Sequence, residues 1–259
     1  MHRTKTNCES PNLRIGAILF VLSTIIPGCA TQNTANNDSL DKQPPEWDVM
    51  LAKGSQILIS RSAKDAIQHY FDKVISQCDK FYGNSPKQVY ATRDVTEVTY
   101  HNLKAKVDSQ AIMTVSQTCA NALYLRGYAS LDLGQIDIAE EYVKRALEMS
   151  PVNSRYLSEL GHIYHAKHKW EMALTTFESA EDNATAFSPR DSMKQELARA
   201  KRGIGYSLIE LGRLAEAEEK LRECLEIDPD DQDALDELNY IASIRERQST
   251  ETTCADGEL

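Results

Sequence analysis

Hydrophobic positions follow three different patterns along this chain. Residues 15–26, IGAILFVLSTII, form one apolar run without a charge, and the run stops at Pro-Gly-Cys. The next residues, 30–46, are polar and show no apolar period. From residue 47 onward, apolar side chains recur at the spacing of amphipathic helices. The pattern predicts a secretion segment, a solvated tether and a helical body, in that order.

The apolar run is too short to cross a membrane, since a spanning helix needs roughly 20 apolar residues. Arg3, Lys5 and Arg14 flank it on the N-terminal side. A basic segment followed by a short apolar core is typical of a secretory signal peptide. A short uncleaved anchor helix is the alternative.

An internal repeat occupies the second half of the chain. Gly127 recurs as Gly161 34 residues later, and as Gly205 after a further 44. Each copy holds two helical patterns separated by a tight turn, and small residues at these positions let the two helices approach closely. An alanine of the second helix recurs with the same offsets, as Ala139, Ala173 and Ala217. The copies predict helical hairpins over residues 120–153, 154–187 and 198–231, a terminal helix over 232–248 and a disordered tail over 249–259.

This spacing resembles that of the tetratricopeptide repeat, a 34-residue helix–turn–helix unit. The resemblance implies an all-α fold: an α-solenoid of stacked hairpins over residues 119–248 that ends in a C-terminal capping helix. The ten-residue insertion before the third copy implies a lengthened first helix there. The alternative is an unrelated helical bundle in which the small residues coincide.

The first half of the body, residues 47–118, is less regular. Residues 47–82 predict a divergent helical hairpin in which Gly54 and Ala66 take the places of the repeat's small residues. Residues 83–118 are rich in Val, Thr and Tyr. We expect helix there because the rest of the body is helical, with a short strand pair as the alternative.

Residues 26–29, IPGC, resemble the lipobox of bacterial lipoproteins. The resemblance implies removal of residues 1–28, thioether lipidation of Cys29 and a tether over residues 29–46. Because Ala30 and not Asp follows the cysteine, it also implies a cell-envelope protein anchored in the outer membrane, with its body facing the periplasm. The alternative is a chance cysteine beside an ordinary signal-peptidase site.

Composition narrows the classes of partner. The chain has 259 residues and a net charge of −10, and it has no basic cluster of the kind that nucleic acid requires. Membrane attachment is therefore expected through the lipid on Cys29. Four cysteines remain beyond Cys29 and permit three full pairings. In an oxidising compartment we prefer a disulfide between Cys78 and Cys119, because both lie in the N-terminal half.

No sequence motif of an enzyme stands out. A phosphate-binding glycine loop, a Gly-x-Ser-x-Gly turn and a His-Glu-x-x-His sequence are all absent. His162, His165 and His168 share one helical pattern, but the outer two point about 120° apart on a helix. We therefore predict no enzyme activity, no cofactor and no metal site.

The resemblance implies that the first helices of successive repeats line a concave groove for a peptide or partner protein. The residues predicted to face it are Asn121, Tyr124, Tyr128, Arg155, Ser158, His162, His165, Arg199, Arg202 and Tyr206. Three arginines there favour an acidic segment. As alternatives, the arginines pair with nearby glutamates and the groove is empty or covered by the N-terminal half, or the protein is a scaffold for assembly of a secretion, pilus or outer-membrane machine.

Overall fold

Helices dominate the computed structural model, which describes residues 43–60 and 62–255. In chain order the elements are α1 (Pro45–Ile59), α2 (Ala63–Ala66), the π-helical segment η1 (Ile67–Phe71), α3 (Asp72–Tyr82), β1 (Gln88–Ala91), α4 (Val95–Val107), β2 (Ile112–Val115), α5 (Thr118–Asp132), α6 (Ile136–Met149), α7 (Ser154–Ala166), α8 (Trp170–Phe187), α9 (Met193–Glu210), α10 (Leu214–Ile227) and α11 (Gln232–Ala255). The predicted all-α fold is confirmed.

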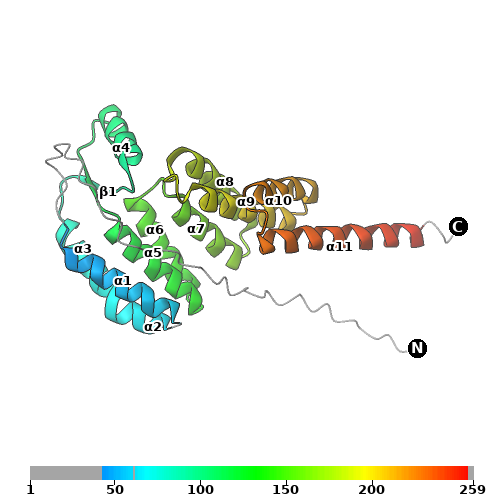
Figure 1. The fold of residues 1–259 in the computed structure, drawn as a ribbon, viewed down its shortest axis with the longest axis horizontal. Helices are drawn as coiled ribbons and strands as arrows, with labels where there is room; N and C mark the ends of the chain where they lie inside the picture. Colours follow the sequence, from blue (N-terminus) through cyan, green and yellow to red (C-terminus); the bar gives the residue numbers. More distant parts are fainter. Residues whose placement is uncertain (1–42, 61, 256–259) are drawn as a thin grey trace. The chain divides into compact units, whose positions relative to one another are not determined.

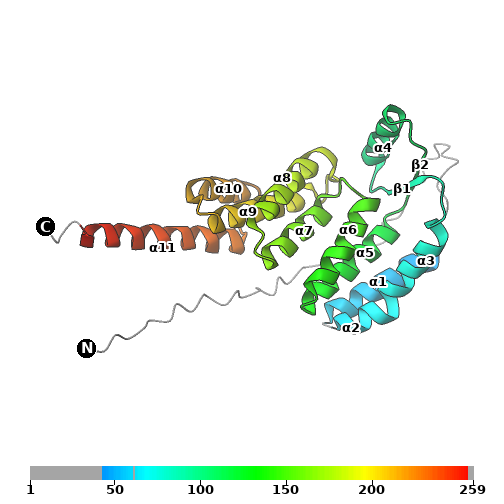
Figure 2. The same ribbon diagram turned by 180° about the vertical axis from the view of Figure 1, so that it is seen from behind.

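Helices α5 to α10 form three successive hairpins, coloured green to orange in Figure 1 and, from behind, in Figure 2. The two helices of each hairpin pack together, and the second helix of one hairpin packs on the first helix of the next. Helix α9 begins at Met193, so the insertion before the third copy lengthens its first helix, as expected. Helix α11 packs on α9 and α10, which is the position predicted for a capping helix.

Small residues allow the close packing within each hairpin. A Cβ atom placed on Gly127, Gly161 or Gly205 would come within 2.6 Å of a side chain on the second helix. The side chains it would meet are those of Val143, Phe177 and Leu221, in that order. Phe177 and Leu221 are fully buried between the helices. The repeated glycines are therefore required by packing between helices.

Three residues with positive φ make the turns inside the hairpins. Gly134 and Gly212 have φ values of 71° and 74°, and His168 has the same role in the second hairpin with a φ of 54°. Glycine adopts this conformation without steric cost, whereas a residue with a Cβ does not. The second repeat therefore carries backbone strain that the first and third repeats avoid.

The N-terminal hairpin packs in the same way with one residue more. A Cβ atom on Gly54 would lie 2.6 Å from the Phe71 ring, and Ala66 is fully buried. Phe71 follows Gly54 by 17 residues, whereas Phe177 follows Gly161 by 16. The π-helical turn of η1 accommodates the extra residue.

Residues 83–118 were expected to be helical, but they contain a parallel strand pair with the helix α4 between the two strands. β1 pairs with β2 from Gln88↔Ile112 to Ala91↔Val115. Parallel strands need a crossover connection, and α4 provides it. Asp94 caps this helix, since its carboxylate accepts hydrogen bonds from two backbone N–H groups of the first turn (2.9 and 3.2 Å). The strand pair that the sequence left open is present.

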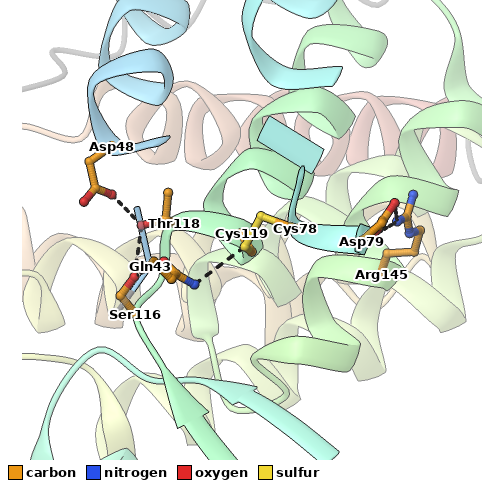
Figure 3. The surroundings of a disulfide bond; sticks show 8 residues. All are labelled: Gln43, Asp48, Cys78, Asp79, Ser116, Thr118, Cys119 and Arg145. Atoms are coloured by element: carbon orange, nitrogen blue, oxygen red, sulfur yellow. Dashed lines mark hydrogen bonds and ion pairs between the residues drawn. A yellow bond between two sulfur atoms is a disulfide. The ribbon is translucent and has the colours of Figure 1, made fainter. Parts of the chain in front are cut away.

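A disulfide joins Cys78 on α3 to Cys119 on α5 (Figure 3). It is the pair that the sequence favoured, and it ties together the two helices on either side of the strand-containing insertion. Gln43 lies beside it: the Gln43 amide donates to the Cys119 sulfur (3.6 Å) and accepts a hydrogen bond from Ser116. The start of the described chain is thus fixed to the same place.

Two predicted boundaries differ from the structure. Helix α1 begins at Pro45, inside the expected tether of residues 29–46, because proline is compatible with the first turn of a helix. Helix α11 continues to Ala255, into the predicted disordered tail, since no glycine or proline interrupts it before Gly257. The predicted signal peptide, Cys29 and the tether as far as residue 42 lie outside the described residues.

Within the described part of the chain, no helix combines the length and the apolar composition that crossing a membrane requires.

Candidate binding surface

The candidate residues occupy one series of helices. Asn121, Tyr124 and Tyr128 lie on α5, and Arg199, Arg202 and Tyr206 lie on α9. Arg155, Ser158, His162 and His165 lie on α7 between them. Because α5 contacts α7 and α7 contacts α9, all ten belong to one succession of neighbouring first helices. We call the side of α5, α7 and α9 that carries them the first-helix face.

Aromatic stacking joins the first two repeats. The rings of Tyr124 and Tyr156 stack with centroids 4.9 Å apart. The Tyr156 hydroxyl donates to Asn121 (2.7 Å) and to Gln117 (3.0 Å). Tyr124 is buried, and this burial raises its pKa to about 12. Tyr124 and Asn121 therefore bind one repeat to the next.

A buried ion pair joins the second and third repeats. The Arg199 guanidinium lies 3.4 Å from the carboxylate of Glu159, and both side chains are almost fully buried. Burial raises the pKa of Glu159 above its usual value, although Arg199 acts in the opposite direction. Glu159 was not among the residues predicted from the sequence. Its place between the apolar residues Leu157 and Leu160 was the signal, because a carboxylate on a buried face needs a cation.

The other two arginines also have carboxylates of the same chain as neighbours. Arg155 lies 3.8 Å from Glu196. Arg202 forms an ion pair with Asp231 and lies 3.7 Å from Asp233. All three arginines therefore pair within the chain, which was the alternative left open above. An acidic ligand would have to compete with these carboxylates.

Glu196 also anchors the strand-containing insertion to the repeats. Arg93, just before α4, donates to Glu97 (2.6 Å) and to Glu196 on α9 (2.9 Å). Glu97 and Glu196 are buried. The four-residue spacing of Arg93 and Glu97 is visible in the sequence, but no sequence signal connects them to Glu196, about a hundred positions later.

A cluster of histidines and aromatic rings lies between α7 and α9. The Nε2 atom of His165 is 2.7 Å from the Ser207 hydroxyl, and its ring lies 4.8 Å from the Tyr206 ring and 5.0 Å from the Phe177 ring. Burial lowers the pKa of His165 to about 4. Burial also lowers the pKa of His162 well below its usual value, helped by the nearby Arg199. Both imidazoles are thus neutral at pH 7.

Two polar atoms in this region lack a hydrogen-bond partner among the described residues. They are Nε2 of His162 and the hydroxyl oxygen of Ser158. Buried polar atoms are normally satisfied, so these two atoms indicate a place for a buried water between the helices. Among the residues placed in the structure, no group of three or more His, Cys, Asp or Glu side chains gathers as a metal site.

Carboxylates surround the end of the first-helix face nearest α11. Burial raises the pKa of Glu237 to about 7, and the neighbouring Glu210 and Asp233 add to the shift. Burial likewise raises the pKa of Tyr206 to about 12, with Glu210 and Glu237 contributing. Negative charge therefore adjoins the aromatic cluster.

Exposure separates the ten candidates into two sets. Tyr124, Ser158 and Arg199 are buried, which corrects their prediction as residues that face a partner in the groove. Tyr124 and Arg199 instead join adjacent repeats. The partly exposed residues are Asn121, Tyr128, Arg155, His162, His165, Arg202 and Tyr206. Tyr128, Arg155 and Tyr206 thus offer one accessible side chain on each of the three first helices.

Family comparisons agree with the repeat geometry. Models of the tetratricopeptide repeat match residues 124–189 and residues 198–231. These segments are tetratricopeptide repeats, so that part of the resemblance inferred from the sequence is confirmed. No curated protein matches the chain.

Solved structures share the fold at low sequence identity. PilF of Pseudomonas aeruginosa has a TM-score of 0.54 and 14% identity, over 79% of this chain and 70% of PilF. A MamA RS-1 ArsTM double mutant has a TM-score of 0.51 and 13% identity, over 82% of this chain and 92% of that one. The first tetratricopeptide domain of human RPAP3 has a TM-score of 0.44 and 18% identity, covering 52% of this chain and 98% of that domain.

Proposed function

We propose that this protein is a lipid-anchored interaction module of the bacterial cell envelope, whose first-helix face binds a segment of a partner protein. The observation that carries the proposal is the row of partly exposed side chains that crosses three repeats, Tyr128, Arg155 and Tyr206. Tyrosine and arginine are common energetic centres of interfaces because they combine large contact area with hydrogen bonding.

The ion pairs of the arginines limit how much negative charge the partner segment needs to carry. Arg199 and Arg202 already hold carboxylates of this chain. Arg155 is the arginine best placed to receive a carboxylate from a partner, since 42% of its side chain is exposed. We therefore propose recognition mainly through the tyrosines, with at most one acidic contact at Arg155. Charge reversal of the buried Arg199 would place two carboxylates together and unfold the protein, so it is a poor test of binding.

The envelope anchor rests on the order of basic segment, apolar run and IPGC in residues 1–29. The disulfide between Cys78 and Cys119 supports an oxidising compartment such as the periplasm. Several acyl chains on Cys29 would hold the protein firmly at the outer membrane, since one chain alone binds only marginally. Replacing Cys29 with serine should release the protein from the membrane fraction. Unchanged partitioning of this variant would refute the anchor.

Photo-crosslinking in intact cells tests the binding face. A photoreactive phenylalanine is placed at Tyr128 or Tyr206, and at Glu178 or Glu219 on second helices as exposed controls. The proposal predicts that the same partner is captured from both tyrosine positions and from neither control. Capture from the control positions alone would place the binding site elsewhere.

A scaffold of an envelope assembly machine is the second candidate function. The same crosslinks separate the two: a binding module captures one partner segment, whereas a scaffold captures several proteins from different surfaces. We propose no catalytic role, because the repeats are typical of interaction modules and their candidate side chains are engaged with one another.

A further inference from the structure

Helix α4 reverses the usual arrangement of an amphipathic helix. It buries Glu97 and His101, with exposed fractions of 0% and 2%. It exposes three aliphatic side chains, those of Val95 (76%), Leu103 (58%) and Val107 (83%). Aliphatic groups in water are unfavourable. Such a surface therefore indicates an interaction that covers it.

The exposed aliphatic side chains lie on one side of α4. Val95, Leu103 and Val107 are separated by multiples of four residues, with Thr99 between them, and this spacing keeps side chains on neighbouring parts of one helical face. The opposite face holds the helix in place, since Glu97 pairs with Arg93, and Arg93 also pairs with Glu196 on α9. The outward face is therefore available for contacts outside the described chain.

Two lysines and one exposed aspartate, Asp108, lie at the C-terminal end of this apolar stripe. Lys104 and Lys106 lie in the last turn of α4 and are exposed. Neither forms an ion pair with another residue for which the structure gives a position. Two unpaired lysines beside aliphatic side chains match the boundary between acyl chains and phosphate groups of a lipid surface.

The N-terminal chain enters the body next to this helix. Gln43 is hydrogen-bonded to Ser116, directly after β2. Because β1 and β2 are parallel, α4 begins at the same edge of the strand pair where Gln43 lies. About 14 residues separate Gln43 from Cys29, and an extended chain of that length reaches at most about 50 Å. A lipid on Cys29 therefore keeps this edge close to the membrane.

We infer that the outward face of α4, formed by Val95, Thr99, Leu103, Val107 and Lys106, rests on the lipid bilayer. This inference depends on the lipid anchor proposed above. The anchor makes contact between α4 and the bilayer effectively intramolecular, so a weak interfacial affinity is sufficient. Contact would fix the orientation of the body at the membrane, which a tether alone does not do.

Quenching by brominated lipids tests the contact. The full-length lipidated protein is reconstituted into vesicles of phosphatidylethanolamine and phosphatidylglycerol, with or without bromine on the acyl chains. Leu103→Trp reports from α4, and Met172→Trp on α8 is the matched control, since Met172 is 45% exposed. The signal of the unmodified protein, which has Trp47 and Trp170, is subtracted. Vesicle flotation of wild type and Cys29→Ser is measured first.

Brominated lipid should reduce the added fluorescence of Leu103→Trp by roughly half or more and leave that of Met172→Trp unchanged, as expected for a ring inside the interfacial region. Equal quenching of the two variants, or none at Leu103→Trp, would refute the inference while Cys29-dependent flotation still supports the anchor. Leu103→Trp protected from water but not quenched would show a protein contact instead. Loss of flotation by the wild-type protein would refute both proposals.

Discussion

The N-terminal hairpin and the second tetratricopeptide repeat use the same packing with different spacing. In each, a glycine of the first helix faces a phenylalanine ring that a Cβ atom would meet at 2.6 Å, Gly54 with Phe71 and Gly161 with Phe177. The N-terminal hairpin has one residue more between them, held in the π-helical turn η1. The packing therefore survives an insertion that changes the sequence pattern. The matched repeat segments accordingly begin only at residue 124.

The two regions also differ in how each hairpin joins the next. The second repeat is joined to the third by residues 188–192, whereas residues 83–117 separate α3 from α5. The disulfide between Cys78 and Cys119 closes this gap. A covalent bond thus secures the N-terminal hairpin to the repeats across the interruption.

The largest expected effect comes from filling the two glycine positions. Gly161→Leu and Gly54→Leu should each lower the free energy of unfolding by about 4 kcal/mol or more, because the added side chain forces apart two packed helices. Urea denaturation measures both. Gly134→Ala measures the separate cost of a side chain at a positive φ, about 1 kcal/mol, because no other described atom lies within 4 Å of an added Cβ there. A cost below about 1 kcal/mol for Gly54→Leu would break the equivalence of the two regions.

Removing the disulfide should affect one region more than the other. The double variant Cys78→Ala and Cys119→Ala should lose about 3 kcal/mol of stability, because the bond closes a loop of 41 residues. Hydrogen exchange should accelerate mainly in residues 45–107. The wild-type protein treated with reductant is the control for the substitutions themselves. Uniform acceleration through α10 would contradict a local role for the bond.

A smaller effect is the dependence of stability on pH that His165 in the second repeat causes. The pKa of His165 is about 4 in the folded protein and about 6.5 in an unfolded chain. As the pH falls below 6.5, only the unfolded chain binds this proton, so stability decreases until about pH 4, by at most about 1.4 kcal/mol for each pH unit.

His165→Gln should therefore be less stable than wild type at pH 7 but lose less stability between pH 6.5 and 4. Urea denaturation at several pH values measures the difference. Glu237, whose raised pKa acts in the opposite direction, is common to both proteins and cancels. Parallel pH profiles would show that His165 is not buried in its neutral form.

The smallest expected effect lies at the turn of the second repeat. His168→Gly should raise stability by up to about 1 kcal/mol, since glycine relieves the strain of a positive φ. Gly212→Ala in the third repeat should lower it by a similar amount. Thermal denaturation of the two variants compares them. A large loss in His168→Gly would mean that the contact between His168 and Trp170 outweighs the strain.

The helical hairpins could be predicted from sequence because their packing rule is local. The spacing from Gly161 to Phe177 lies within one hairpin, and helix periodicity places both at the contact. The strand pair could be named only as an alternative to helix, since β1 and β2 stabilise each other across α4 and each is only four residues long. Short apolar segments do not distinguish strand from helix by themselves.

The sequence predicted which helices carry the candidate residues, but not whether each side chain is exposed or paired. The spacing within the repeats placed all ten residues on the first helices. Whether Arg199 is exposed or paired depends on its distance to Glu159, 40 positions earlier on a neighbouring helix. No pattern in one sequence gives that distance. The ion pairs that neutralise the arginines therefore appear only in the structure.

The most direct test of the binding face is a titration of the segment captured by crosslinking. Isothermal calorimetry compares wild type with Tyr128→Ala and Tyr206→Ala, and with Glu178→Ala and Glu219→Ala as controls on second helices. We predict that each tyrosine variant binds at least about tenfold more weakly, a loss of about 1.4 kcal/mol or more, and that the control variants bind as wild type does. Full affinity in both tyrosine variants, or equal losses in the controls, would contradict recognition by the first-helix face.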